Sequence, residues 1–264
     1  MIIRYFHNLS AEQRSVRADR HLGYTLAFVA GAVNAGGFLA IGQYTSHMTG
    51  IVSTMADQMA LGQFKLALAA LSAWIAFVLG AATTAILINF ARRRHLRSQY
   101  ALSLLLEALL LLLFGLAGAY LNHLHEFLDP VTVLLLCFIM GLQNAIITKV
   151  SSAVIRTTHV TGLTTDLGIE LGKLIYINRG HDPELAVRAN RGKLLLHLLL
   201  ILYFFSGGVL GALGFKYIGY RTTLVLSFVL TLLALGPIIS DIRYRLKKYR
   251  QKASETTTAA APKV

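Results

Sequence analysis

The sequence predicts an all-α membrane protein with about six transmembrane helices, arranged as two inverted three-helix repeats. Three observations lead to this prediction. The chain is 55% hydrophobic and only 14% charged, with a mean hydropathy of +0.60. Several apolar stretches are long enough to cross a bilayer, and one short motif occurs twice in the same context. A soluble domain of this size rarely carries so few charges, which favours a surface that faces lipid.

The predicted spans are roughly 22–43, 65–91, 100–121, 131–149, 194–215 and 222–242. A hydrocarbon core of about 30 Å is crossed by about 20 residues of helix, and each stretch is near that length. Two further helical stretches, roughly 48–62 and 160–177, are shorter or more polar. Each begins at a Thr-Gly pair. We therefore expect each repeat to contain a short, Thr-Gly-initiated helix that is broken or re-entrant.

The basic residues indicate the orientation of the chain. With a cytoplasmic N-terminus and six crossings, only Lys65, Lys216 and Arg221 of the 25 Lys and Arg residues face outward. This positive-inside bias supports placing both termini in the cytoplasm. The net charge of +13 therefore reflects orientation and contact with anionic lipid, and a nucleic-acid partner is not expected.

The chain divides into four predicted parts. These are a cytoplasmic N-terminal segment (1–21), a first membrane repeat (22–121), a second membrane repeat (131–242), and a basic, disordered cytoplasmic tail (243–264). The first span follows several arginines, as in a signal peptide, but it is full length and lacks a clean cleavage site, so we expect an uncleaved anchor. The single cysteine, Cys137, excludes an internal disulfide, and we expect it to be a small buried apolar residue.

The repeated motif indicates an internal duplication. Residues 45–50 read Thr-Ser-His-Met-Thr-Gly, and residues 157–162 read Thr-Thr-His-Val-Thr-Gly. The flanking segments match in the same order, namely Gly31 to Ala35 with Gly141 to Ala145, and Phe77 to Gly80 with Phe205 to Gly208. Each half contributes three spans, an odd number, so the second half enters the membrane from the opposite side. Inverted repeats of this kind recur in secondary transporters, whose substrate site lies at the repeat interface.

The segments 31–34, 46–50, 140–145 and 157–162 together resemble the YoaK-like family, a bacterial group of multi-pass membrane proteins without an established function. The resemblance covers roughly 20–242 and implies a bacterial inner-membrane protein with six spans. It implies no substrate, cofactor or catalytic residue. Two positions depart from the usual family pattern: Ile51 stands where members usually carry Asn, and Asn34 where many carry Asp.

The two Thr-Gly helix starts are the candidate substrate site. Such a pair can supply a hydroxyl N-cap and free backbone N–H groups at the positive end of a helix dipole. Two such starts that meet near the centre would hold a polar or anionic group of a substrate. The alternative is a pair of tight interfacial turns. The candidate substrate-binding residues are Asn34, His47, Thr49, Gly50, Gln143, Asn144, His159, Thr161, Gly162, Asp166 and Glu170.

Several of these side chains can also titrate. His47 and His159 either couple protons or hydrogen-bond the backbone and fix the turn. A metal is not expected, because no further ligands follow at a diagnostic spacing. Glu107, within a run of leucines, and Asp166 are the candidate proton-coupling residues. For Glu107 the alternative is a structural hydrogen bond to a neighbouring helix. For Asp166, on one helix face with Glu170, the alternative is an ion pair with Lys173 or Arg156.

We expect a secondary transporter of an unidentified small solute, coupled to protons and working by rocking of one half against the other. The alternatives are a non-transporting membrane scaffold or regulatory subunit and, least favoured, an intramembrane enzyme. We expect no enzyme and no catalytic residue, because the chain has no nucleophile elbow, H-E-x-x-H, Walker A or dinucleotide motif. No cofactor is expected. The expected partners are the lipid bilayer, the solute and a second copy of the chain in a homo-oligomer.

Overall fold

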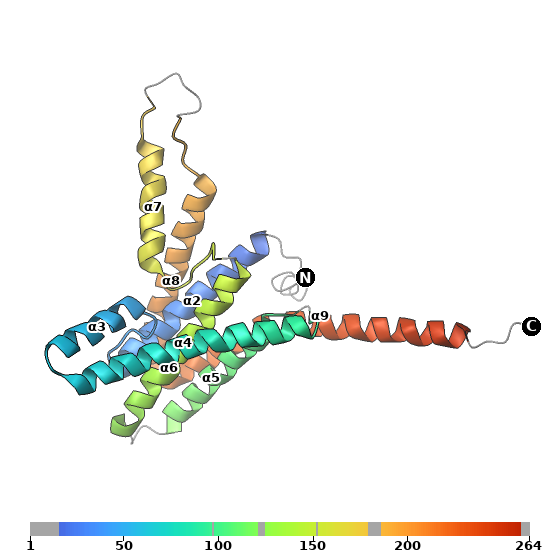
Figure 1. Cartoon of the computed structure of the whole chain (residues 1–264), viewed down its shortest axis with the longest axis horizontal. Coiled ribbons are helices and arrows are strands. Elements are labelled where there is room, and N and C mark those ends of the chain that lie inside the picture. The colour runs from blue at the N-terminus through green and yellow to red at the C-terminus, as the bar shows by residue number, and fades with distance from the viewer. Residues whose placement is uncertain (1–15, 97, 121–124, 152, 179–185, 260–264) are drawn as a thin grey trace, which may run out of the picture.

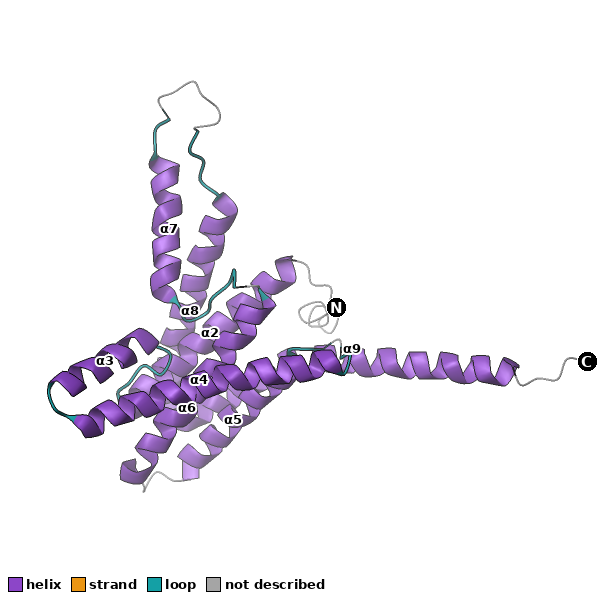
Figure 2. Cartoon of the chain, in the orientation of Figure 1, coloured by secondary structure: helices purple, strands orange, loops and turns teal. Residues whose placement is uncertain are grey.

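The computed structural model describes residues 16–96, 98–120, 125–151, 153–178 and 186–259. Within these ranges every regular element is helical (Figure 2). The elements are α2 (Val16–Ile41), α3 (Met48–Ala60), α4 (Phe64–Arg93), α5 (Ala101–Tyr120), α6 (His125–Val150), α7 (Val160–Ile175), α8 (Arg191–Ile218), the 3-10 turn η2 (Gly219–Arg221) and α9 (Thr222–Ala259). Most of the predicted N-terminal segment, residues 1–15, lies outside the described residues.

The described residues contain five stretches that are long and apolar enough to cross a membrane, so the chain is a multi-pass membrane protein. They are Asp19–Leu39, Phe64–Arg93, Ala101–Gly118, Pro130–Val150 and Arg191–Tyr244. The last stretch is 54 residues long and contains two helices, α8 and α9, because η2 interrupts it. Each predicted span corresponds to one long helix, and the two shorter predicted stretches correspond to α3 and α7.

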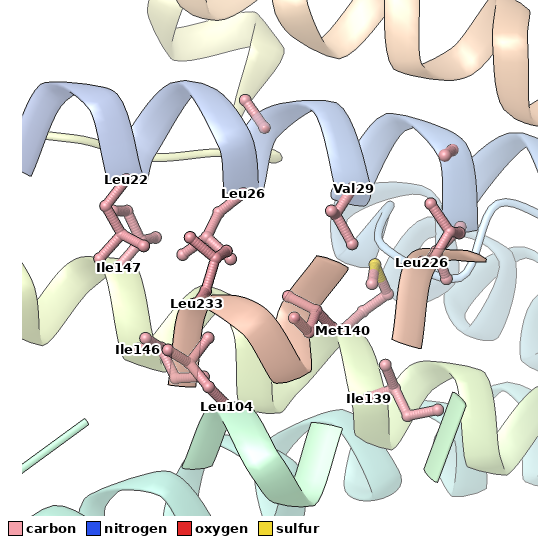
Figure 3. Packing of buried hydrophobic residues seen from close by; sticks show 14 of the residues in the cluster. Leu22, Leu26, Val29, Leu104, Ile139, Met140, Ile146, Ile147, Leu226 and Leu233 are labelled. Atoms are coloured by element: carbon pink, nitrogen blue, oxygen red, sulfur yellow. The ribbon is translucent and has the colours of Figure 1, made fainter. Parts of the chain in front are cut away.

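The buried core lies where α2, α5, α6, α8 and α9 meet. Figure 3 shows Leu26 of α2, Leu104 of α5, Ile146 of α6 and Leu233 of α9 gathered in one region of this core. Cys137 of α6 is also buried, as predicted. Lipid tails are as apolar as leucine, so close van der Waals packing, rather than escape from water, holds these helices together.

Glycines allow α2 and α8 to touch backbone to backbone. A Cβ atom added at Gly31 of α2 would lie 2.0 Å from the carbonyl oxygen of Phe204 on α8. A Cβ atom added at Gly207 of α8 would lie 2.0 Å from the carbonyl oxygen of Phe28 on α2. No side chain fits at either position. The contact therefore depends on both glycines.

The same reciprocal contact joins α4 and α6. A Cβ atom added at Gly80 of α4 would lie 2.0 Å from the carbonyl oxygen of Phe138, and one added at Gly141 of α6 would lie 2.0 Å from that of Phe77. The hydroxyl of Thr84 on α4 also donates to the carbonyl oxygen of Leu142, at 3.1 Å. These contacts shift the predicted match between 77–80 and 205–208 by one residue.

The glycine of α8 that corresponds to Gly80 is one residue earlier than the sequence comparison predicted. The alignment matched Gly80 with Gly208, but the helix contacts match it with Gly207. A Cβ atom added at Gly208 would lie 3.8 Å from the nearest atom, the carbonyl oxygen of Gly31, which is ordinary van der Waals contact. Because two glycines are adjacent in α8, sequence similarity alone does not decide which of them faces α2.

The third pair, α5 and α9, packs in opposite directions. The hydroxyl of Ser98, just before α5, donates a hydrogen bond to Asp241 in the middle of α9, with 3.3 Å between Oγ and Oδ2. Ser227 of α9 donates to the carbonyl oxygen of Ala108, at 2.7 Å. Small residues again allow the approach, because a Cβ atom at Gly115 of α5 would lie 2.1 Å from Thr223 Oγ1.

The tail differs from the sequence prediction. Disorder was predicted over 243–264, but α9 continues as a helix to Ala259 and projects away from the bundle (Figure 1). The reason is local, because no glycine or proline occurs between Pro237 and Ala259. Lys, Arg, Gln and Ala favour helix, and they extend a helix that the membrane segment has already nucleated. Residues 260–264 lie outside the described residues.

The helix crossings generate a first prediction. Gly141→Ala lowers the free energy of unfolding by about 2 kcal/mol or more, because the new methyl group forces two backbones apart. The matched control is Gly168→Ala in α7, where an added Cβ atom meets nothing within 4 Å. Alanine there stabilises the helix by up to about 1 kcal/mol. Thermal unfolding of the purified protein in detergent checks both changes, and equal midpoints for the two variants would contradict the close crossing.

Candidate functional site

The chain folds back along α2 before α3 begins. Asn34 lies about two turns, or roughly 10 Å, before Ile41, the last residue of α2. Ser46, which follows that helix end, nevertheless reaches Asn34. It donates to Asn34 Oδ1 from its backbone nitrogen, at 3.2 Å, and from its hydroxyl, at 2.9 Å. The segment that leads into α3 is thus held beside α2, about two turns before the end of that helix.

A matching fold-back occurs along α6. Asn144 lies nearly two turns before Val150, the last residue of α6. The hydroxyl of Thr158, just before α7, donates to Asn144 Oδ1 at 2.5 Å. Asn144 Nδ2 donates to the carbonyl oxygen of Met140 in its own helix, at 2.8 Å, which orients the amide. Both predicted asparagines therefore anchor the loop that leads into a short helix.

The two motif histidines stand directly before the first residues of α3 and α7, in the N-cap position. Neither imidazole caps its helix by a hydrogen bond. Each ring instead lies over the motif glycine. A Cβ atom added at Gly50 would lie 2.7 Å from His47 Nδ1, and one added at Gly162 would lie 2.2 Å from His159 Cδ2. This contact gives a physical reason for the His-x-x-Gly spacing.

The capping role predicted for the two threonines is wrong. Thr49 and Thr161 are the second residues of α3 and α7, because the helices begin at Met48 and Val160. Both threonine side chains are exposed, as are the neighbouring imidazoles. The two hydroxyl groups therefore lie in the first turn of each helix and do not cap it.

Sequence reasoning missed two buried hydroxyl groups. Thr45 and Thr157 are 1% and 0% exposed, and neither Oγ1 has a hydrogen-bond partner among the described residues. They are the first residues of the two copies of the motif. The sequence did offer a signal for these residues. Thr45 and Thr157 occupy the same place in the two copies of the motif, as do the anchoring residues Ser46 and Thr158.

Gln143 joins the two halves in the core. Its side chain is fully buried on α6, and Nε2 donates to the carbonyl oxygen of Leu26 on α2, at 3.0 Å. Its Oε1 is buried without a partner in the part of the chain that the structure describes. The Nε2 group of Gln143 therefore links α6 to α2.

The carboxylates of α7 have different environments. Asp166 is exposed, whereas Glu170 is buried. Glu170 Oε1 accepts a hydrogen bond from Lys173 Nζ at 2.9 Å, and Oε2 accepts one from the backbone nitrogen of Asn190 at 2.6 Å. The bond from Lys173, followed by that from Asn190, lowers the pKa of the Glu170 carboxyl below its usual value. Lys173 thus pairs with Glu170, not with Asp166 as the alternative proposed.

Asn190 extends this contact into α8. Its side-chain oxygen accepts a hydrogen bond from the backbone nitrogen of Lys193, at 3.0 Å, and caps the helix. Glu170, Lys173 and Asn190 therefore fasten the end of α7 to the start of α8. In this position Glu170 holds two helices together.

Glu107 is fully buried on α5. Neither of its carboxyl oxygens has a hydrogen-bond partner among the described residues. The structural hydrogen bond considered as an alternative role is therefore not found there. Of the predicted site residues, Glu107 is the one whose polar side-chain atoms are all buried without a partner among the described residues.

The predicted residues form separate groups rather than one cluster. Asn34 and His47 lie at the start of α3, Asn144 and His159 at the start of α7, and Glu107 in the helix pair α5 and α9. Figure 1 shows α3 and α7 projecting in different directions from the bundle. No group of three or more His, Cys, Asp or Glu side chains in the described part of the chain could hold a metal ion.

The comparisons with known proteins place this architecture in one family. A family model with the description "Protein of unknown function (DUF1275)" matches residues 22–236, which agrees with the resemblance to the YoaK-like family. No curated protein and no solved structure matches the chain.

The contact between ring and glycine generates a second prediction. Gly162→Ala costs about 1 kcal/mol relative to Gly172→Ala, because the methyl group displaces the His159 ring from its position. Gly172 is the control on the same helix, where an added Cβ atom meets nothing within 4 Å. Once His159→Ala is present, the difference between the two alanines disappears. Unfolding midpoints of the four variants check the coupling, and a difference that persists without the imidazole would contradict it.

Proposed function

The chain belongs to the DUF1275 family of proteins of unknown function, and we propose that it is a secondary transporter of a small solute, built from two inverted repeats. One observation carries the proposal above all others. The two halves make the same glycine contacts with exchanged partners. Gly31 of the first half meets α8 of the second half, and Gly141 of the second half meets α4 of the first half.

The directions of the helices support the inverted arrangement. Gly23 of α2 lies near Leu200 of α8, and Gly36 of α2 lies against Phe215 of α8, so the two helices run in the same direction. The fifth span would then enter the membrane from the same side as the first. That order results when α2, α4, α5, α6, α8 and α9 each cross once and the halves are related by a two-fold axis in the membrane plane.

The fold-backs support re-entrant helices. Because Ser46 and Thr158 reach back nearly two turns along α2 and α6, α3 and α7 begin inside the membrane, from opposite sides. Lipid does not satisfy such irregular backbone, which is tolerated where it lines a watery cavity. The positive ends of both helices, with Thr49 and Thr161 exposed beside them, suit a polar or anionic group of the solute.

The glycine crossings also suit alternating access. At Gly31 and Gly80 the helices meet through backbone atoms rather than interlocked side chains. Such contacts allow one helix to turn over another with little repacking. Rocking about these crossings would move the start of α3 and the start of α7 in turn. The solute would then reach the two sides of the membrane alternately.

The resemblance to the YoaK-like family supports a bacterial inner membrane as the setting. The charge distribution supports the proposed orientation with both termini in the cytoplasm, because this arrangement leaves only Lys65, Lys216 and Arg221 outside. Its partners in this proposal are the bilayer, the solute and a second copy of the chain. It performs no chemistry on the solute and binds no nucleic acid.

A non-transporting scaffold is the second candidate, and one observation favours it. The predicted polar residues lie in separate groups, and the amides of Asn34 and Asn144 are already used to anchor loops. A protein that holds partner proteins would need these anchors and no shared cavity. The transport experiment below separates the two functions.

The inverted arrangement generates a third prediction, on residue accessibility. Ser53 of α3 and Thr165 of α7 are both exposed and each stands three residues after its motif glycine. In a Cys137→Ala background, a cysteine at position 53 reacts with a membrane-impermeant maleimide in intact cells. A cysteine at position 165 reacts only after the cells are permeabilised. Labelling of both from the same side would contradict inversion, and the cysteine-free background is the control.

Transport itself is the fourth prediction. In proteoliposomes with a pH gradient and an internal pH-sensitive dye, at least one member of a panel of small polar metabolites produces a saturable proton flux. Thr161→Val lowers this flux tenfold or more, because it removes a hydroxyl at the start of α7. Thr164→Val, exposed one turn further along α7, leaves the flux unchanged. A folded protein without any saturable flux would favour the scaffold.

A further inference from the structure

We propose that Glu107, together with Ser103 on the preceding turn of α5, forms a proton-binding site inside the membrane. As a coupling site it would rest on the transporter function proposed above. As a site that binds and releases a proton it depends only on the surroundings of the carboxyl group. The two claims therefore fail separately.

The polar side-chain atoms of Glu107 and Ser103 are buried without partners in the described part of the chain. Glu107 and Ser103 are each 0% exposed and lie within the apolar span Ala101–Gly118. Being four residues apart, they share one face of α5. Both carboxyl oxygens and the serine Oγ are buried without a hydrogen-bond partner among the described residues. Three unsatisfied oxygen atoms thus occur on successive turns, where buried polar atoms are ordinarily paired.

The environment of Glu107 is apolar. Leu104 and Leu111 of α5 and Leu230 of α9 belong to the same core and are fully buried. The hydroxyl of Ser227 on α9 donates its hydrogen bond to the carbonyl oxygen of Ala108, at 2.7 Å, and not to Glu107. An ionised carboxylate in such a place is costly, because Glu107 is buried from bulk solvent and no described group donates a hydrogen bond to it. A bound proton removes that cost.

Charged and titratable groups also occur on the elements packed against α5. On α9, Asp241 bonds Ser98, about 14 Å along α5 from Glu107. At the other end of α5, Tyr220 of η2 packs against Gly118, about 16 Å from Glu107.

η2 also carries Arg221, and α9 carries Arg243 and Tyr244, all of which are exposed. Further titratable groups lie on α6, on α4 and beside α5. α6 carries the buried Cys137 and, in its last turn, Lys149. The basic residues in the last turn of α4 are Arg92 and Arg93. Directly before α5, Tyr100 donates to the carbonyl oxygen of Lys149, about 10 Å from the level of Glu107. None of these groups forms a described ion pair with Glu107, so a proton is the charge that can neutralise it.

A proton fits this site better than a metal cation. Hard cations such as Ca²⁺ and Mg²⁺ take about six or more oxygen ligands, whereas Glu107 and Ser103 offer three. Proton binding forms one O–H bond on a carboxylate oxygen and cancels its charge. Release breaks that bond and transfers the proton to water. A permanently protonated structural carboxyl would instead donate to a nearby acceptor.

The experiment uses dicyclohexylcarbodiimide, an apolar reagent that enters membranes. The O–H of a protonated carboxyl adds across a C=N bond of the reagent, and acyl transfer then gives a stable N-acylurea. We expect mass spectrometry of the purified full chain to find this adduct on Glu107 at pH 6. The adduct yield is expected to fall at least tenfold by pH 9. In a sodium arm, replacing choline chloride with sodium chloride is expected to leave the yield unchanged.

The variants separate the site from the fold. Glu107→Gln forms no adduct and unfolds at the same temperature as the wild type or higher, because the side chain it replaces makes no hydrogen bond. Asp57→Asn, at an exposed position of α3, keeps the full adduct yield. A wild-type protein without the adduct at pH 6, or with a pH-independent yield, would overturn the proposal. Protection by sodium would overturn it in favour of a cation site. An adduct without any solute flux would leave the proton site standing and reject the transporter.

Discussion

Backbone contact at glycine is the constraint on which the rest of the structure depends. At Gly31, Gly80, Gly141 and Gly207 a neighbouring carbonyl oxygen occupies the place of a side chain. In lipid no hydrophobic force draws helices together, so dispersion and weak Cα–H···O contacts at such short approaches contribute much of the attraction. Each crossing joins a helix of the first half to one of the second, so neither half completes its packing alone.

The same crossings position the candidate site. Asn34 follows Gly31 by one turn of α2, and Asn144 follows Gly141 by one turn of α6. Each of these two helices therefore carries two features on successive turns. The first is the glycine that contacts a helix of the other half, and the second is the asparagine whose side chain hydrogen-bonds the loop that follows the helix. The starts of α3 and α7 are held close to the places where the halves meet, although the two starts are not gathered into one cluster.

Local sequence patterns predicted most of the helices, and non-local contacts account for what was missed. The apolar runs located α4 and α5 within a few residues, and the repeated motif located α3 and α7. The pairing of Glu170 with Asn190 was missed because it depends on how α7 lies against α8. The choice of Gly207 over Gly208 depends on a helix face, and the ring contacts of the histidines depend on side-chain rotamers.

The exchanged pairing of α2 with α8 and of α4 with α6 has a consequence for the origin of the chain. In the proposed inverted arrangement, a single three-helix half would find its glycine partner only in an oppositely oriented copy of itself. The smallest complete ancestor would be an antiparallel dimer, inserted in both orientations with little charge bias. Because three is an odd number, fusing two such genes end to end inverts the second half without an added helix. The lopsided distribution of Lys and Arg would then record how the fused chain fixed one orientation.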